Sequence, residues 1–204
     1  MNKIIKNTLI LTTITLVAGI LLGLVYEVTK APIAAAQEKA KQEAFKLALP
    51  DAASFEAYSG YDESDAAEVL RNAGYPDADI TEVVIGKDGN GNDLGCVITV
   101  VSHEGYSGDI TMSVGLLADG TVKGVEMLSI SETAGLGMKA AEPDFRGQFQ
   151  DKQVSKFSYT KSGEQGDDKI DALSGATITT NAVTNAVNSA LAYFQNMLGG
   201  SVNE

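Results

Sequence analysis

The residues best arranged for chemistry lie in a run of small side chains directly before the last helix that the sequence predicts. The run reads Asp171-Ala172-Leu173-Ser174-Gly175-Ala176-Thr177. Small residues let a ligand approach the backbone, and the free N–H groups and positive dipole end of a helix N-terminus favour a phosphate. The hydroxyl of Thr177 would lie at that anion site. The same residues also fit an ordinary loop followed by a helix cap.

Few other side chains could take part in a reaction. The chain has one histidine, one cysteine and no tryptophan, so it cannot assemble a zinc site, an iron–sulfur cluster or a cysteine redox pair from its own residues. We expect His103 to be a surface residue and Cys96 a small core residue. No nucleophilic triad is evident, and we predict neither catalytic residues nor a metal site. Any redox chemistry would therefore depend on a bound cofactor.

The helix behind the small-residue run is the best-defined element. Its apolar residues recur at spacings of four, four, three and four, which places them on one face: Val183, Val187, Leu191, Phe194 and Leu198. We expect Thr179 or Thr180 to be the N-cap and Gly199-Gly200 to end the helix.

A β pattern precedes this helix. Runs rich in β-branched residues alternate with Gly/Asp/Asn clusters and predict strands at Ile80–Ile85, Leu94–Val101, Ile110–Leu117 and Thr121–Ile130. Asp119-Gly120 predicts a type I′ turn, so the strands should form an antiparallel meander. A Gly-rich loop at 131–137, a short helix near 140–150 and a strand around 154–160 should follow. Strands followed by helices without βαβ alternation indicate an α+β domain.

The chain before Ile80 is less informative. Ala34–Leu49 predicts a helix that Pro50 stops, because the segment is rich in Ala, Lys, Glu and Gln and holds no Gly or Pro. Residues 51–79 show no clear period, and we expect short helices and loops there.

The N-terminal segment predicts a membrane span. Thr8–Tyr26 contains nineteen residues without a charge, which as a helix cover roughly 28 Å, close to the thickness of a bilayer's hydrocarbon core. Lys3 and Lys6 precede the run, whereas the charges after it nearly cancel, so the positive-inside rule leaves the N-terminus in the cytoplasm. A cleaved signal peptide is the alternative, since Ala34-Ala35-Ala36 offers an A-x-A pattern, but the apolar run is longer than usual for one.

These segments divide the chain into four parts. They are a cytoplasmic tip (1–7), a transmembrane helix (8–26), a helical stalk (27–50) and an extracytoplasmic domain (51–204). The formal net charge is −12, and most acidic residues lie in the last part. A chain this acidic would be repelled by a phosphate backbone, so nucleic acid is not expected as a partner.

Two motifs resemble one known family. Asp171-x-x-Ser174-Gly175-Ala176-Thr177 is similar to the flavinylation motif of FMN-binding domains in the G subunit of Rnf-type ion-translocating oxidoreductases and the C subunit of the sodium-pumping NADH:quinone reductase. Glu132-Thr133-Ala134-Gly135-Leu136-Gly137 resembles the family's E-T-P-G-L-G loop, with Ala134 in place of the usual proline. Phe145-Arg146-Gly147-Gln148-Phe149 resembles the stretch that usually follows.

The resemblance implies a covalent FMN. In that family a flavin transferase joins the FMN phosphate to the last threonine of the motif, which is Thr177 here. It further implies that Asp171 serves recognition by the transferase. The residues expected to shape the turn or contact the flavin are Ser174, Gly175, Ala176, Glu132, Thr133, Leu136 and Gly137.

The resemblance also implies a function. We expect a single-pass subunit of the cell membrane that relays electrons among the other subunits of a complex coupling ferredoxin and NAD chemistry to sodium or proton movement. The corresponding subunit of the quinone reductase, which is usually longer, is the first alternative. A membrane-anchored ligand-binding module without a redox role and a stand-alone external reductase are the others.

Overall fold

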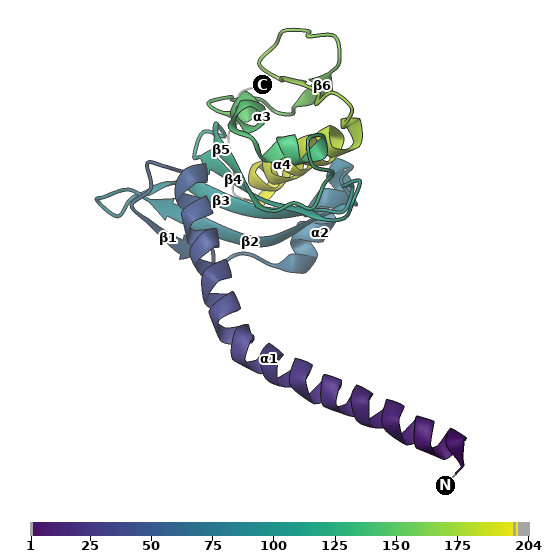
Figure 1. Cartoon of the computed structure of the whole chain (residues 1–204). Helices are drawn as coiled ribbons and strands as arrows, with labels where there is room; N and C mark the ends of the chain where they lie inside the picture. Colours follow the sequence, from purple (N-terminus) through teal and green to yellow (C-terminus); the bar gives the residue numbers. More distant parts are fainter. Residues whose placement is uncertain (1, 198, 200–204) are drawn as a thin grey trace. The chain divides into compact units, whose positions relative to one another are not determined.

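The computed structural model describes residues 2–197 and residue 199 (Figure 1). The chain divides into two compact units, Met1–Lys41 and Gln42–Glu204, and helix α1 (Lys3–Ala48) begins in the first and ends in the second. The helix runs without a break through the predicted transmembrane segment and the predicted stalk, with Pro32 inside it.

The N-terminal unit has the surface of a membrane anchor. Within the described residues, α1 is long and apolar enough to cross a bilayer. Its large apolar side chains are exposed, as in Leu22 and Val28. The hydroxyls of Thr13 and Thr29 donate to carbonyl oxygens of the preceding turn, at 2.8 Å each, so they need no water. An uncovered apolar helix of this length fits a lipid environment.

The second unit is built on a five-stranded antiparallel sheet. Its strands follow the chain order β1 to β5, as the predicted meander requires (Figure 1). Their bounds are β1 Ser54–Ala57, β2 Ala78–Lys87, β3 Asp93–Ser102, β4 Ile110–Leu117 and β5 Val122–Ser129. The α+β prediction is confirmed, and the four predicted strands correspond to β2–β5.

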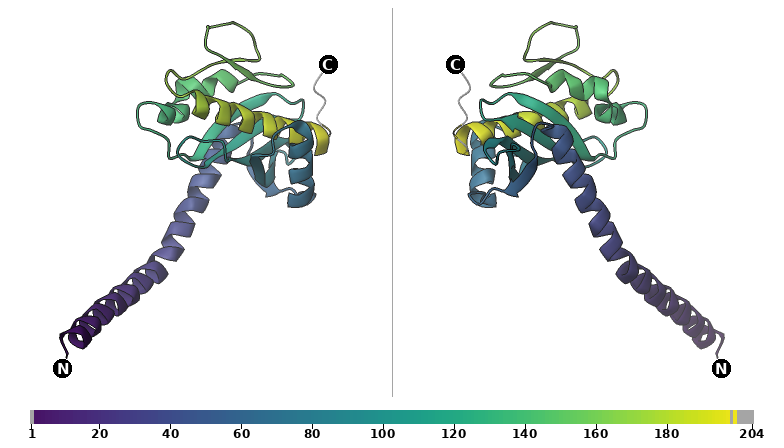
Figure 2. Two further views of the ribbon diagram at one scale, coloured as in Figure 1. Left: turned by 90° about the vertical axis from the view of Figure 1, so that its right-hand side faces the viewer. Right: turned by 90° about the vertical axis from the view of Figure 1, so that its left-hand side faces the viewer.

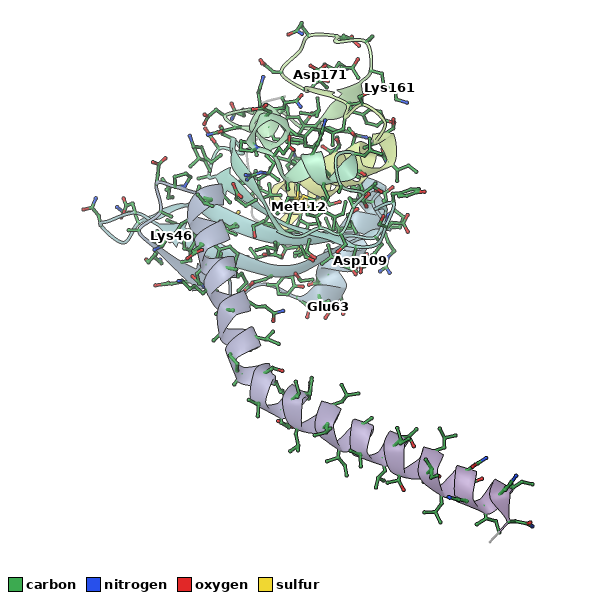
Figure 3. All side chains as sticks on the ribbon, in the orientation of Figure 1. Lys46, Glu63, Asp109, Met112, Lys161 and Asp171 are labelled. Atoms are coloured by element: carbon green, nitrogen blue, oxygen red, sulfur yellow. The ribbon has the colours of Figure 1, made fainter. Side chains whose placement is uncertain are left out.

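One face of the sheet is covered by helices. Helix α4 (Thr177–Met197) runs across this face, and α2 (Glu63–Ala73) packs beside it against β2 (Figure 2). Alternate residues of the strands, such as Ile98 in β3 and Met112 in β4, are fully buried in the core beneath them. Met112 is labelled in Figure 3. Of the predicted apolar face of the last helix, Val183, Val187, Leu191 and Phe194 lie in this core. Leu198 is the fifth residue of that prediction. That residue and Gly200, of the predicted helix end, lie outside the described residues.

The opposite face receives the last turns of α1. Phe45, Ala48 and Leu49 are buried there against Val84 and Val97. The neighbours of Val97 in β3 face the α4 side, because side chains alternate across a strand. Each face of the sheet therefore has its own apolar cluster.

A cross-strand glycine pair lets α1 approach the sheet closely. Gly115 of β4 pairs with Gly124 of β5. A Cβ atom on Gly115 would overlap the carbonyl oxygen of Ala48, and one on Gly124 would lie 3.0 Å from it. The absence of both side chains therefore makes room for the backbone of α1. The end of α1 therefore packs directly on the backbone of β4 and β5.

The last third of the unit positions the small-residue run. A 3₁₀ turn, η1 (Gly137–Ala141), is followed by α3 (Pro143–Arg146) and a second 3₁₀ turn, η2 (Gly147–Phe149). Strands β6 (Ser158–Thr160) and β7 (Lys169–Asp171) form a small parallel pair. β7 ends at Asp171, which is the first residue of the small-residue run.

The local predictions were confirmed only in part. The region 51–79 contains one of the expected short helices, α2, together with a strand, β1, that was not predicted. The short helix predicted near 140–150 is limited to α3, with a 3₁₀ turn on each side. The strand predicted at 154–160 is confined to Ser158–Thr160. The helix continues from Thr177, so Thr179 and Thr180 lie in its first turn and neither is the N-cap.

The β4–β5 turn also differs from the prediction. A type I′ turn needs positive φ at both central residues, but only Gly120 has it, at 86°. Leu117 N–H donates to Thr121 at 2.9 Å and Gly120 N–H to Leu117 at 2.9 Å. The loop therefore has three residues with glycine in the left-handed position, the second most common hairpin geometry.

Candidate functional site

The small-residue run forms a tight turn followed at once by a helix. Ala176 N–H donates to the carbonyl of Leu173 at 3.0 Å, and Gly175, the third residue of this turn, has a φ of 75°. A positive φ at that position is what a type II turn requires, and glycine adopts it without steric cost. The turn reverses the chain so that α4 begins at Thr177.

Thr177 lies at the open end of α4. Its side chain is half-buried, and none of the described residues forms a hydrogen bond with its hydroxyl. The first backbone hydrogen bond of the helix is from Thr180 N–H to Ala176, so the N–H groups before Thr180 lack the partners that residues further along have. The start of α4 therefore offers N–H donors beside the Thr177 hydroxyl, none of which has a partner among the described residues, and this is the arrangement that the predicted anion site requires.

The second motif repeats this geometry. Leu136 N–H donates to the carbonyl of Thr133 at 3.1 Å, and Gly135 at the third position again has a φ of 75°. Met138 N–H donates to the same carbonyl at 3.2 Å. Leu136 and Gly175 lie in contact distance, since a Cβ atom on Gly175 would be 3.2 Å from Cδ2 of Leu136. The two turns predicted to share a site therefore do lie together.

Glu132 links three segments of the site. Its Oε2 accepts a hydrogen bond from the Thr179 hydroxyl at 2.9 Å, and its Oε1 accepts one from Ser107 N–H at 3.1 Å. The residue is only 7% exposed. A Cβ atom on Gly137 would lie 2.6 Å from Thr179 Oγ1 and 2.8 Å from Glu132 Oε2. Glycine at position 137 is thus needed for the carboxylate to reach α4.

These elements enclose a pocket of about 590 Å³. Its walls come from the loop between β3 and β4, the second motif and the start of α4. The lining residues are Tyr106, Glu132, Thr133, Leu136, Gly137, Gly175, Ala176, Thr177, Ile178 and Thr179. Ligand sites for molecules of drug or cofactor size usually have volumes of roughly 300–1,000 Å³.

The pocket has an unusually apolar rim. Among the described residues from 42 onward, four large apolar side chains are strongly exposed, and three of them line this pocket: Tyr106 at 69%, Leu136 at 42% and Ile178 at 52%. The fourth is Leu47. Such clustering of exposed apolar surface around one concavity is typical of a binding site for a flat or apolar ligand group.

Most of the predicted site residues meet at this pocket, but two do not line it. Asp171 and Ser174 are exposed outside it, at the approach to the turn (Asp171 is labelled in Figure 3). Three lining residues were not predicted as ligand contacts, namely Tyr106, Ile178 and Thr179. Tyr106 belongs to a loop far from both motifs in sequence, and no local pattern pointed to it.

Gln148 is another residue whose role the sequence did not define. Its Oε1 accepts from Asp171 N–H at 2.6 Å, and its Nε2 donates to the carbonyl of Asp171 at 3.4 Å. The flanking Phe145 and Phe149 are buried and pack edge-to-face at 5.9 Å between ring centroids. The phenylalanines therefore anchor the segment, and Gln148 holds the start of the first motif.

The two residues set aside by the sequence lie away from the pocket. His103 is 42% exposed and hydrogen-bonds to Asp79 and Asp109, at 2.9 Å each, and these two bonds raise its pKa. Cys96 is buried in β3, and burial raises the pKa of its thiol to about 12. At neutral pH this thiol is protonated and unreactive.

Comparison with known proteins identifies the pocket as part of an FMN-binding domain. The family profile of the FMN-binding domain matches residues 105–192, which include the β3–β4 loop, both motifs and most of α4. A second profile, that of the RnfG N-terminal region, matches residues 1–46 and so covers most of α1.

Full-length relatives define the family more closely. The G subunit of the ion-translocating oxidoreductase complex of Methanosarcina acetivorans is 36% identical over 94% of this chain and 95% of its own. The G subunit of the Na⁺-translocating ferredoxin:NAD⁺ oxidoreductase complex of Acetobacterium woodii is 34% identical over 95% and 93%. The chain therefore belongs to the family of G subunits of ion-translocating oxidoreductase complexes, as its motifs predicted.

A solved structure shares the fold. The C subunit of the Na⁺-translocating NADH-quinone reductase from Parabacteroides distasonis superposes with a TM-score of 0.51 over 74% of this chain and 79% of its own, at 19% identity. This similarity concerns the fold alone. Membership of a membrane-complex family, together with the apolar α1, makes the chain a membrane-anchored protein.

Proposed function

We propose that this protein carries FMN covalently on Thr177 and relays electrons within a membrane-bound ion-translocating ferredoxin:NAD oxidoreductase complex. The observation that carries the proposal is the unpartnered Thr177 hydroxyl at the N-terminus of α4, inside the FMN-binding domain and on the wall of its pocket. A flavin transferase would form a phosphoester between this oxygen and the flavin phosphate: the threonine oxygen bonds to phosphorus, the P–O bond to the leaving group of the flavin donor breaks, and that group departs with the hydroxyl proton.

The pocket residues fit the two ends of FMN. The free N–H groups of the first turn of α4 and the positive end of its dipole would hold the phosphate. Tyr106, Leu136 and Ile178 would cover the flavin ring with their exposed apolar surface. When bound, FMN supplies the redox chemistry, while this chain binds and orients it.

The exposed part of the first motif suits recognition by a maturation enzyme. Asp171 and Ser174 are exposed outside the pocket, so a transferase could contact them while Thr177 is modified. We assign Asp171 to transferase recognition, and Ser174, Gly175 and Ala176 to the shape of the turn. Glu132, Thr133, Leu136 and Gly137 line the pocket on the side of the second motif.

The charges at the N-terminus support the orientation that we propose for the chain in the membrane. Lys3 and Lys6 precede the apolar part of α1, so a single pass with a cytoplasmic N-terminus and an external domain satisfies the positive-inside rule. The partners are then the other subunits of the complex. The relatives from A. woodii and Clostridium ljungdahlii are named for sodium and proton translocation respectively, so their names do not assign the coupling ion.

Attachment can be tested on a denaturing gel. The full chain is co-expressed with a flavin transferase and illuminated in the ultraviolet. We expect a fluorescent band for the wild type and none for Thr177→Ala. Thr177→Ser is the matched control, because it keeps the hydroxyl at the same position. A dark wild-type band that still co-purifies with FMN would indicate a binding module without covalent attachment.

A further inference from the structure

The carboxylate of Glu132 is buried among neutral hydrogen-bond donors. Its two hydrogen-bond donors, Ser107 N–H and the Thr179 hydroxyl, are both neutral. Among the described residues, no lysine, arginine or histidine forms an ion pair with it. Both oxygens act as acceptors, which is the role of an ionised carboxylate. Burying a charge costs free energy. If the residue at position 132 served only to join the three segments, a glutamine with its neutral amide could do so at lower cost.

The position of this charge is fixed by close packing. A Cβ atom on Gly105 would lie 2.9 Å from Oε1, and one on Gly137 would lie 2.8 Å from Oε2. Because Gly105 and Gly137 have no side chains, the backbone packs closely against both oxygens of the carboxylate. The charge cannot turn toward solvent without breaking both hydrogen bonds, and it forms part of the pocket wall.

We infer that Glu132 lowers the reduction potential of the flavin held in this pocket. The inference rests on the proposed function, in that FMN occupies the pocket. Each electron that the flavin gains without a proton adds negative charge to the ring, and a fixed negative charge nearby opposes that change. The effect is larger here than in water, because the effective dielectric constant beside a protein wall is about 20 rather than about 80. The electrons come from the redox partner that the proposed relay supplies.

Glu132→Gln isolates the charge from the hydrogen bonds. The glutamine side chain has the same shape, its oxygen can accept from Ser107 N–H, and its amide can donate to the Thr179 hydroxyl, which also accepts. The three segments therefore remain joined while the charge is lost. We expect the flavin midpoint potential, measured by spectroelectrochemical titration of the full flavin-loaded chain, to shift upward in this variant.

Glu104→Gln is the matched control. Glu104 belongs to the same β3–β4 loop and accepts hydrogen bonds from neutral donors of α4, Asn185 at 2.8 Å and Asn181 at 3.4 Å, but it does not line the pocket. The control variant removes the same charge, so we expect a clearly smaller shift. Equal potentials for the wild type and Glu132→Gln, or equal shifts for the two glutamine variants, would overturn the inference.

A second variant covers the case in which Glu132→Gln does not fold. Thr179→Val removes a hydrogen bond that partly neutralises the carboxylate but keeps its charge, so we expect the midpoint potential to fall. An unchanged or higher potential would contradict the inference. These outcomes are separate from those of the proposed function, because a failure of covalent attachment appears as a dark gel band, whereas a failure of tuning appears as unchanged potentials in protein that contains flavin.

Discussion

The side-chain amide of Gln148 pairs with the backbone of Asp171, accepting from its N–H at 2.6 Å and donating to its carbonyl at 3.4 Å. An amide paired with a peptide group in this way imitates one step of a β ladder. It extends the short β7 strand at its C-terminal end, where the first motif begins. The path of the motif toward Thr177 therefore depends on a residue 23 positions earlier in the chain.

This pairing predicts a defect in maturation. In Gln148→Ala the start of the motif loses a hydrogen bond worth about 1 kcal/mol, which corresponds to about a fivefold drop in the competent population. We expect the initial rate of flavin attachment to fall by a similar factor, measured as in-gel fluorescence against time with limiting transferase. Gln150→Ala is the control, since Gln150 is exposed and close in sequence. Equal rates for both variants would show that the pairing is not needed.

Gly137→Ala should disrupt the contact between the second motif and α4. The new methyl group would lie 2.6 Å from Thr179 Oγ1 and 2.7 Å from Glu132 Cβ, so one of these side chains must move. We expect a loss of about 1–3 kcal/mol in the free energy of unfolding and weaker FMN binding. Gly147→Ala is the control, because its backbone is helical and its Cβ would meet nothing within 4 Å. Urea denaturation of both variants distinguishes them, and equal losses would refute the steric argument.

Much of the site was predictable because its determinants are local. Gly135 and Gly175 stand where a turn requires positive φ, and Thr177 follows the second turn directly, so each motif carries its own geometry. Strands β2–β5 were likewise indicated by runs of β-branched residues. The predicted boundaries differ from the structure by no more than two residues.

What could not be predicted depends on contacts between distant segments. Ser107 N–H donates to Glu132, 25 positions further along the chain, and Tyr106 is the neighbour of Ser107 in this loop. Thr180 was expected to cap the helix, but its hydroxyl instead accepts from Leu173 N–H at 3.0 Å, across the turn. Short helices were expected in the region 51–79, but the bounds of α2 were not predicted although Asp62 and Gly74 form its caps, because the region shows no clear apolar period.

Ala134→Pro should stabilise the second motif. Ala134 is the second residue of the turn that Gly135 completes, a position where proline is favoured because its φ is already near −60°. No hydrogen bond from Ala134 N–H to another described residue would be lost. We expect a gain of about 0.4–1 kcal/mol, through the lower entropy of the unfolded chain. A thermal unfolding midpoint below that of the wild type would show that the turn does not fit proline.

Gly115→Ala should separate α1 from the sheet. The added methyl group would overlap the carbonyl oxygen of Ala48, which is backbone and cannot turn aside. We expect a destabilisation at or above the upper end of the usual overpacking range of about 1–3 kcal/mol, together with proteolytic cleavage near residue 50. Gly89→Ala is the control, because its Cβ would meet nothing within 4 Å and its φ is not positive. Resistance of Gly115→Ala to limited proteolysis would contradict this account.

The His103 cluster should make stability depend weakly on pH. Hydrogen bonds to Asp79 and then Asp109 raise the pKa of His103 in the folded protein. A raised folded-state pKa means that protonation favours folding, so the stabilisation is complete below the unfolded value of about 6.5 and is lost as pH rises through the raised value. Because the cluster is exposed, we expect it to contribute less than about 1 kcal/mol.

The contribution can be measured as a difference between two proteins. The free energy of unfolding of the wild type minus that of His103→Asn is determined by urea denaturation in detergent at several pH values. Other titrating groups are common to both and largely cancel. The difference should be greatest near pH 6 and decline toward about pH 9. A difference that rises with pH would mean that the imidazole folds in its neutral form, with one aspartate left unpaired beside it.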